Sequence, residues 1–437
     1  MDFELGKIFI KKKLFKKALI IFNDILKKDH NNVRAIFQIG KIYYDSNDLN
    51  QSIIYFKKCN EIQPKNSNII FNLALALQGT GKIDEAREKY NELIKINNND
   101  IKSYYGLYSL GIENITNELY ERLKKIRINK NISIFEKSLI NFIFSKIEKK
   151  KKNYENEVNY LNLFHKQCYE ANLLFNNQSN FYYQNIISKN YKNIKFHNKF
   201  KPISKFNNNK HIFIIGLPRS GSTLVETLIT HNSEKVLSLG EFHGINTSIL
   251  DQVGEKIYSK NFEKKNFQLE LDENIFQENL VEKYGNFKKK LFLDKSLENF
   301  FNIEIILRFF PNAKIVHTYR DYKDSIIAIY QTMMPELSWS HRIQDIKNYI
   351  KTYKEIIEYF KKKYPDKIID VELNELTNKK EIETKKILEF CEIDFKKDFL
   401  DFDENKKLFN KTNSFLQVRK KIKKYEAEKY QPYYHLI

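Results

Sequence analysis

A periodicity of 34 residues runs through the first hundred positions of the chain. When the sequence is shifted by this period, small residues coincide at one set of positions and aromatic residues coincide at another. The small set is Gly6, Gly40 and Ala74, and the aromatic set is Phe22, Phe56 and Tyr90. Small residues let two helices approach closely, whereas bulky residues fill the contact with a neighbouring helix. The period therefore predicts three stacked helical pairs.

This repeat resembles the tetratricopeptide repeat (TPR) over about residues 3–104. Further positions in register are Phe9, Tyr43 and Leu77; Ala18, Ser52 and Ala86; Ile25, Cys59 and Leu93; and His30, Pro64 and Asn98. The resemblance implies a superhelix whose concave face binds a peptide or protein. The alternative is a scaffold that forms a homodimer and binds no such ligand.

Composition shifts divide the chain into three expected parts. Residues 1–104 hold the repeats. Residues 105–205 keep a helical period, and we expect further helical hairpins and a linker there. The stretch "KFNNNK" at 205–210 has the composition of a domain boundary. Residues 206–437 then form a second domain.

The second domain opens with the pattern of a strand, a tight turn and a helix. The apolar run His211–Ile215 predicts a buried parallel strand. Gly216 and Gly221 allow a tight turn, and a helix is expected to start at Ser222. A helix N-terminus attracts phosphate through its unpaired N–H groups and its dipole. The glycine spacing matches the nucleotide-binding loop G-x-x-x-x-G-K-[ST].

The loop nevertheless lacks the lysine of that motif, because Ser222 and Thr223 follow Gly221 directly. In a nucleotide triphosphatase this lysine holds the outer phosphates, so its loss argues against phosphoryl transfer. A sulfuryl group carries less charge, and Arg219 inside the turn could bind it in bidentate fashion.

The segment "GLPRSGSTLVE" resembles the 5′-phosphosulfate loop of sulfotransferases that use 3′-phosphoadenylyl sulfate (PAPS). It is most similar to the branch that contains protein-tyrosine sulfotransferases and bacterial TPR-sulfotransferases, and the resemblance covers about residues 208–437. It implies that the 5′-phosphosulfate is held by Arg219, Ser220, Gly221, Ser222 and Thr223.

Two downstream motifs extend the resemblance to catalytic residues. "LSLGEFHG" implies that Glu241 is the base that takes the acceptor proton. His243 is a competing base, and on an extended segment it would share a face with Glu241. "LFLDKSLEN" predicts a strand at Leu291–Leu293 and implies that Lys295 stabilises charge on the leaving phosphate.

Two further motifs concern the 3′-phosphate. In "FFPNAKIVHTYRDYKDSIIAIY" the resemblance assigns this phosphate to Arg320, but Ala328 stands where the family has a serine, and Ser325 lies one turn earlier. Near the C-terminus, "SFLQVRKKIKKYEAEKYQPYY" resembles the segment that closes over the adenine, with contacts expected from Ser414, Arg419 and Lys429. In "DVELNELT", Leu373 replaces a tyrosine common in relatives.

Charge and cysteine content add limits. Lys and Arg total 75 and Asp and Glu total 55, which gives a net charge of +20. The lysines are spread along the chain, so we interpret the charge as compositional and expect no nucleic-acid partner. The three cysteines lack metal-ligand spacing, and we expect no metal and a reducing compartment. No long apolar run or signal-peptide pattern occurs, so we expect a bacterial cytoplasmic protein without a membrane partner.

The sequence therefore predicts an α + α/β chain, with TPR-like repeats followed by a P-loop-type parallel α/β sulfotransferase domain. The predicted activity is transfer of a sulfuryl group from PAPS to an acceptor hydroxyl, with a protein tyrosine as one candidate. Three other functions stay open: a TPR adaptor with a non-catalytic nucleotide-binding domain, a P-loop kinase and a nucleic-acid-binding protein.

Overall fold

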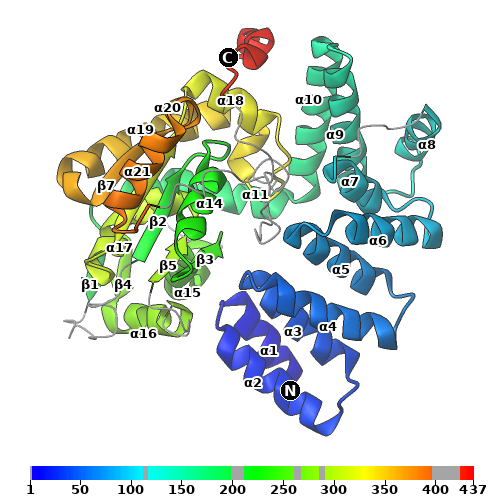
Figure 1. Ribbon diagram of the computed structural model, residues 1–437, viewed down its shortest axis with the longest axis horizontal. Helices are drawn as coiled ribbons and strands as arrows, with labels where there is room; N and C mark the ends of the chain where they lie inside the picture. The colour runs from blue at the N-terminus through cyan, green and yellow to red at the C-terminus, as the bar shows by residue number, and fades with distance from the viewer. Residues whose placement is uncertain (1, 112–116, 198–210, 260–266, 285–290, 396–423) are drawn as a thin grey trace.

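The computed structural model describes residues 2–111, 117–197, 211–259, 267–284, 291–395 and 424–437. The chain has an all-helical N-terminal half and a C-terminal half built on a parallel sheet, and the two lie beside each other (Figure 1). This arrangement confirms the predicted fold class.

The first six helices form three antiparallel pairs. They are α1 (Asp2–Lys11), α2 (Phe15–Lys28), α3 (Val33–Asp45), α4 (Leu49–Ile62), α5 (Ser67–Thr80) and α6 (Ile83–Ile96). Within a pair, the small residue of the first helix faces the aromatic residue of the second. A Cβ atom on Gly6 would lie 2.6 Å from the ring of Phe22, and one on Gly40 would lie 2.8 Å from the ring of Phe56. The small residues therefore set the distance between the paired helices.

Short polar side chains start many of these helices. Asn32 accepts a hydrogen bond from the main-chain N–H of Ala35, and Asp48 accepts one from that of Gln51. Such caps satisfy the free N–H groups at a helix start. The Asn-rich turns of the sequence are therefore the breaks between helices.

The helical half continues with six more α-helices, of which α9 and α10 form a long antiparallel hairpin. They are α7 (Ile101–Ser109), α8 (Asn117–Arg127), α9 (Ile134–Lys150), α10 (Tyr154–Ala171), α11 (Leu173–Phe181) and α12 (Ser188–Asn190), with a π-helix, η1 (Tyr182–Ile187), between the last two. Ser133 and Glu136 form a reciprocal capping box at the start of α9. The α9–α10 hairpin stands beside the sheet domain, on the same side as the repeats (Figure 1).

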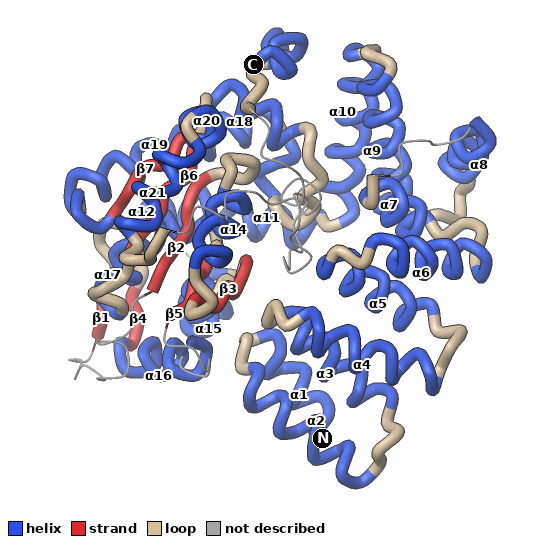
Figure 2. The backbone as a smooth tube through the Cα atoms, viewed as in Figure 1, coloured by secondary structure: helices blue, strands red, loops and turns tan. Residues whose placement is uncertain are grey.

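Five parallel strands form the central sheet in the order β3-β5-β2-β6-β7, seen as the red strands of Figure 2. They are β2 (His211–Gly216), β3 (Val236–Gly240), β5 (Leu291–Asp294), β6 (Lys314–Tyr319) and β7 (Ile368–Glu372). Ile212 and Ile214 of β2 pack into one apolar cluster, whereas Phe213 and Ile215 pack into another. Because helices cover both faces, the central strand β2 is buried at every position.

The remaining elements surround the sheet. They are β1 (Lys195–His197), β4 (Glu270–Asp272), α14 (Ser222–Asn232), α15 (Gly244–Ile257), α16 (Glu273–Tyr284), α17 (Ile303–Phe309), α18 (Tyr322–Tyr330), α19 (Ile343–Lys363), α20 (Leu373–Asn378), α21 (Lys380–Phe390) and the short helices η2 (Leu297–Asn302), η3 (Ser338–His341), η4 (Pro365–Lys367) and η7 (Glu428–Leu436). Strands β1 and β4 pair with each other, apart from the main sheet.

The two halves of the chain are in direct contact. Phe15 of α2 packs edge-on against Phe242 with ring centroids 6.2 Å apart. Asn47, in the turn between α3 and α4, donates to the main-chain oxygen of Ser238 at 3.4 Å. Both contacts reach the end of β3, so the repeats adjoin the edge of the sheet at which the site is built.

Within the described residues, no helix combines the length and apolar character needed to cross a membrane. The three cysteines are buried free thiols, and burial raises the pKa of Cys59, Cys168 and Cys391 to about 12 in each case.

Candidate active site

The carboxyl ends of the parallel strands carry the residues singled out by the sequence. Arg219 follows β2, Glu241 follows β3, Lys295 follows β5 and Arg320 follows β6. In parallel α/β sheets, ligands bind outside these ends. The topology thus brings residues that are far apart in the chain to one edge of the sheet.

The loop between β2 and α14 is shaped by three residues with positive φ, namely Gly216 (149°), Arg219 (67°) and Gly221 (90°). A Cβ atom on Gly216 would lie 2.2 Å from the main-chain oxygen of Thr318, so only glycine fits there. The hydroxyl of Ser220 bonds to that of Thr318 at 2.8 Å and fastens the loop to β6. The sequence correctly predicts the strand, the turn and the helix start at Ser222.

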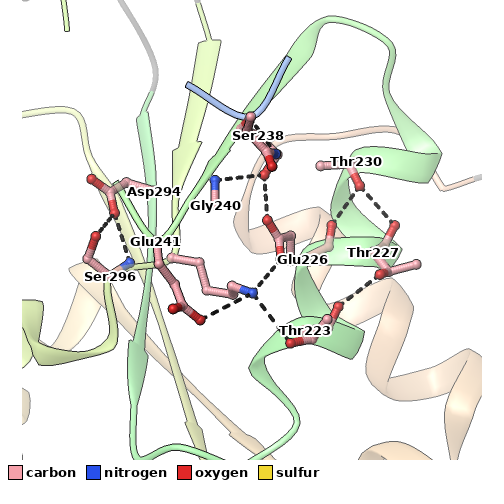
Figure 3. Close-up of polar contacts among 11 residues, drawn as sticks. Thr223, Glu226, Thr227, Thr230, Ser238, Gly240, Glu241, Asp294 and Ser296 are labelled. Carbon is pink, nitrogen blue, oxygen red and sulfur yellow. Dashed lines mark hydrogen bonds and ion pairs between the residues drawn. The ribbon is translucent and has the colours of Figure 1, made fainter. Parts of the chain in front are cut away.

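Lys295 directly follows β5 and contacts a polar cluster that includes Thr223, Glu226 and Glu241, which are labelled in Figure 3. Its ammonium group is 2.8 Å from a carboxylate oxygen of Glu226 and 3.9 Å from one of Glu241, and it donates to the hydroxyl of Thr223 at 3.4 Å. The residue is 1% exposed. Burial opposes its charge, but the carboxylates of Glu226 and Glu241 outweigh this and raise the pKa of Lys295. The lysine therefore stays protonated, and the neighbouring carboxylates fix the position of its ammonium group.

Glu226 was not singled out by the sequence analysis. It lies on α14 three residues after Thr223, so both side chains are on the same helix face, and it also accepts a hydrogen bond from Ser238 (Figure 3). The sequence did contain a signal for this residue, because a single acidic side chain in an otherwise apolar, buried helix requires a hydrogen-bonding or charged partner. The identity of that partner, Lys295, could not be read from the sequence.

Glu241 differs from Glu226 in its exposure. Its side chain is 47% exposed, while that of Glu226 is 11% exposed. The main-chain oxygen of Gly240 accepts from the N–H of Lys295 at 2.9 Å, which ties the turn that carries Glu241 to the end of β5. Glu241 is thus the carboxylate of the cluster that an incoming molecule could reach.

His243 does not share an extended segment with Glu241, as the sequence had led us to expect. Its φ is 56°, a left-handed conformation at the start of α15, and its Nδ1 contacts the carboxylate of Glu298. Burial opposes protonation of this ring, yet the adjacent Glu298 carboxylate raises the pKa of His243 to about 9. A histidine that is already protonated at neutral pH is a poor general base.

Asp294 fixes the turn beside Lys295. Its carboxylate accepts from the N–H of Ser296 at 2.8 Å, from the hydroxyl of Ser296 at 2.6 Å and from the hydroxyl of Tyr284 at 2.7 Å. Burial raises the pKa of Asp294, which these donors partly offset. The aspartate of the "LDKS" motif is therefore an anchor for the turn, while the lysine points into the site.

Arg320 is a buried cation whose hydrogen-bonding capacity is incompletely used. It is 4% exposed; it donates to the hydroxyl of Tyr430 at 2.9 Å and to the main-chain oxygen of Asp324 at 3.1 Å. Its Nε has no hydrogen-bond partner among the described residues. A buried charge in this state is suited to an anionic ligand, which fits the phosphate that the resemblance assigns to it.

Arg219 and Arg320 lie close to each other. Burial lowers the pKa of Arg219, and the positive charge of Arg320 lowers it further. The loop from Arg219 to Thr223 spans the distance between this pair of arginines and the Lys295 cluster. Arg219 and Thr223 of this loop thus lie near Arg320 and Lys295, respectively.

The two departures from the family pattern have structural consequences. Ala328 packs against Tyr430 in an apolar cluster, where a serine hydroxyl would be buried. The hydroxyl of Ser325 donates a hydrogen bond to the main-chain oxygen of Asp321 at 2.8 Å. Leu373 lies over Gly221, with its Cδ1 2.7 Å from the position of a Cβ on that glycine.

The remaining predicted contacts are at the C-terminus. Lys429 is exposed, with its ammonium 5.2 Å from the centre of the Tyr430 ring. Ser414 and Arg419 lie outside the described residues. In the part of the chain that is described, no group of three or more His, Cys, Asp or Glu residues could hold a metal ion.

Comparisons with known proteins agree with this arrangement. A family model described as "Sulfotransferase family" matches residues 211–397, and two described as "Tetratricopeptide repeat" match residues 33–66 and 55–88. A protein of Aquifex aeolicus (strain VF5), described only as uncharacterized, is 24% identical over 416 residues, or 90% of this chain. The chain spans about half of that relative's length (52%).

Among solved structures, the sulfotransferase domain of the Synechococcus PCC 7002 olefin synthase matches with a TM-score of 0.36 and 19% identity, over 54% of this chain and 91% of that one. MamA matches with a TM-score of 0.30 and 22% identity, over 37% and 93% of the two chains. None of these matches points to the protein-tyrosine branch. From the family matches, the chain combines N-terminal tetratricopeptide repeats with a domain of the sulfotransferase family.

Proposed function

We propose that this protein transfers a sulfuryl group from PAPS to an acceptor hydroxyl. The observation that carries the proposal is the position of Lys295, buried at the end of β5, bonded to the loop at Thr223 and flanked by the exposed carboxylate of Glu241. A cation and an accessible base beside an anion-binding loop are the groups that such a transfer requires.

The donor would be held by the loop and by the two arginines. The N–H groups and hydroxyls at the start of α14, together with Arg219, would bind the 5′-phosphosulfate, and Arg320 would bind the 3′-phosphate. The Nε of Arg320, which lacks a partner, supports this assignment. PAPS supplies an activated sulfuryl group on its 5′-phosphate, and it enters here as a co-substrate.

In the proposed reaction, an S–O bond to the acceptor oxygen forms while the S–O bond to the phosphate breaks. The acceptor proton passes to the carboxylate of Glu241, and the electron pair of the broken bond stays on the phosphate oxygen. Lys295 would stabilise the charge that develops on this oxygen. Glu226 would keep Lys295 charged and oriented, because it is the nearer of the two carboxylates.

The repeats support a protein partner and favour a polypeptide acceptor such as a protein tyrosine. The first helices of the three pairs adjoin a pocket of about 290 Å³. Its lining includes aromatic rings and cations, namely Phe3, Lys7, Arg34 and Phe37. We propose this surface as the place where a protein partner binds.

The test is incubation of the purified chain with sulfur-labelled PAPS and a panel of tyrosine peptides, phenols and glycans. We expect label in an acceptor and release of adenosine 3′,5′-bisphosphate in equal amount. Binding of the bisphosphate without transfer to any acceptor would favour the non-catalytic adaptor. Transfer that requires ATP and Mg²⁺ would favour a kinase and contradict the proposal.

A matched pair of variants assigns the base. Glu241→Gln should keep bisphosphate binding and lower kcat by about 10²- to 10⁴-fold, because a carboxamide cannot accept the proton. Glu255→Gln removes an exposed carboxylate on α15 and should leave kcat unchanged. Equal turnover in both variants would remove Glu241 from the role of base.

A further inference from the structure

Each of the three repeat units has a residue in the left-handed conformation in the turn between its two helices. These residues are Lys13 (φ 60°), Asn47 (φ 66°) and Gly81 (φ 83°), and they are 34 residues apart, like the other repeat positions. Glycine and asparagine adopt this conformation at little cost, and a lysine fills the same position in the first unit. The turn itself therefore does not require asparagine, and the side chain of Asn47 calls for a different explanation.

Asn47 differs from its counterparts because its side chain reaches the sheet domain. Its amide nitrogen donates to the main-chain oxygen of Ser238 on β3 at 3.4 Å, and a Cβ atom on Gly240 would lie 3.7 Å from the amide carbon of Asn47. Figure 3 shows a ribbon in the blue of the repeats beside Ser238. Among the described residues, the ammonium of Lys13 forms no hydrogen bond or ion pair, and it lies 5.7 Å from the centre of the Phe15 ring.

The part of β3 that Asn47 contacts is irregular. The pairing of β3 with β5 shifts register between Ser238 and Gly240, and Gly240 has a φ of 60°. The hydroxyl of Ser238 accepts from the N–H of Gly240 at 3.1 Å and donates to the carboxylate of Glu226. A β-bulge changes the direction of the side chain beside it, and the next residue along the chain is Glu241. The direction of Glu241 therefore depends on how this bulge is held.

A second contact of the repeats lies on the other side of Glu241 in the chain. Phe15 of α2 packs edge-on against Phe242, which is 1% exposed. Lys17, also on α2, forms an ion pair with Glu282 of α16. Exposed ion pairs add little stability, so the ring contact is the stronger of the two. The repeats thus hold the chain both before and after Glu241.

We propose that Asn47 of the second repeat unit is a positioning residue for Glu241, which it keeps in place by holding the bulged end of β3. The repeats would then be a part of the active site as well as a surface for a partner. Donor binding would not depend on this contact, because the proposed donor site is formed by the loop after β2 and by Arg320. This inference rests on the proposed function, because it concerns the residue assigned as the base of that reaction.

The test is steady-state transfer from sulfur-labelled PAPS by the full chain, to whichever tyrosine peptide, phenol or glycan of the panel takes up most label. Asn47→Gly removes the amide and keeps the left-handed turn. We expect kcat to fall about five- to tenfold, the effect of one lost hydrogen bond. The KM for PAPS and the affinity for adenosine 3′,5′-bisphosphate should stay as in the wild type. Asn47→Asp keeps the shape of the side chain and should give the same loss, because a carboxylate cannot donate to the oxygen of Ser238.

A double-mutant cycle separates positioning from a general disturbance of the site. In a Glu241→Gln background, Asn47→Gly should have no further effect on kcat, because the carboxylate that it positions is already gone. A general disturbance would lower kcat by the same factor in both backgrounds. Equal factors would therefore contradict the proposal.

Controls separate the remaining outcomes. Lys13→Gly changes the same turn position in the first unit, where the described residues show no side-chain hydrogen bond to the sheet domain, and it should match the wild type. Urea midpoints check that each variant is folded, and Asn47→Asp carries the test if Asn47→Gly is not. If the wild type transfers no label to any acceptor, the proposed function fails and this inference fails with it. If the wild type is active and the Asn47 variants match it in kcat, the role of Asn47 is contradicted while the proposed function stands.

Discussion

At the scale of single residues, the two carboxylates beside Lys295 differ in solvent exposure, and this difference suits them to different roles. Glu226 is buried and 2.8 Å from the ammonium, and Glu241 is half-exposed and 3.9 Å from it. A buried partner holds a charge in place, whereas an accessible carboxylate can exchange a proton with an incoming hydroxyl. The cluster therefore offers one carboxylate for positioning and one for proton transfer.

This division predicts distinct pH profiles for variants of the two glutamates. The carboxylate of Glu226 contributes more than that of Glu241 to raising the pKa of Lys295, so Glu226→Gln should lower that pKa. The alkaline limb of the kcat profile should then move to lower pH. Glu241→Gln should reduce kcat across the whole range. A Glu226→Gln enzyme whose alkaline limb does not move would show that this carboxylate does not hold the lysine charged.

Sequence patterns located most of these residues because each follows a strand or opens a helix. Lys295 and Arg320 were predicted from short motifs at strand ends, and the structure brings them to the same loop. Glu226 was missed because its partner is 69 positions away (295 − 226). The left-handed conformation of His243 could not be predicted, because in a residue other than glycine it is decided by packing and leaves no local signal.

At the scale of elements, long periodic segments were predicted best. The apolar run of β2 and the repeat helices carry enough residues for a period to be recognised. Strand β1 has three residues and no clear alternation, so its parallel pairing with β4 could not be anticipated. The same holds for β3, whose "VLSLG" sequence is a short strand at the edge of the sheet.

Glycine positions in helices give a prediction at this scale. Gly40→Ala places a Cβ 2.8 Å from Phe56 and 3.3 Å from Tyr55, so we expect a loss of about 1–3 kcal/mol in unfolding free energy. A Cβ atom on Gly254 of α15 would lie 3.9 Å from the Cβ of Leu250, which is an ordinary contact. Gly254→Ala should therefore stabilise that helix by up to about 1 kcal/mol. Urea unfolding of both variants checks the opposite signs. A gain in stability for Gly40→Ala would mean that the repeat pair can open without cost.

At the scale of the whole molecule, a pair of histidines joins the two halves. Nδ1 of His165 on α10 lies 3.1 Å from Nδ1 of His341 on η3, and Nε2 of His165 is 2.7 Å from the main-chain oxygen of Tyr330. Both rings are buried. One ring must donate a hydrogen bond to the other, so at least one of the facing nitrogens must be unprotonated. The contact between α10 and the sheet domain is therefore sensitive to acid.

The direction of that sensitivity follows from the pKa values. Burial lowers the pKa of His165 to about 3 and that of His341 to about 4, against about 6.5 for an unfolded histidine. The unfolded chain thus binds protons first, and stability from this pair is complete above pH 6.5 and is lost progressively as the pH falls toward 4 and 3. We expect a loss of about 2 kcal/mol per histidine between pH 6.5 and 5.

Urea midpoints measured from pH 7.5 to 5 check this expectation. In His165→Gln the decline toward acid should be reduced, although the variant starts from a lower stability because a buried contact is changed. His30→Gln, at an exposed position outside the interface, should keep the wild-type slope. If His165→Gln and the wild type decline in parallel, the acid sensitivity arises elsewhere, and the histidine pair contributes packing alone to the junction between α10 and the sheet domain.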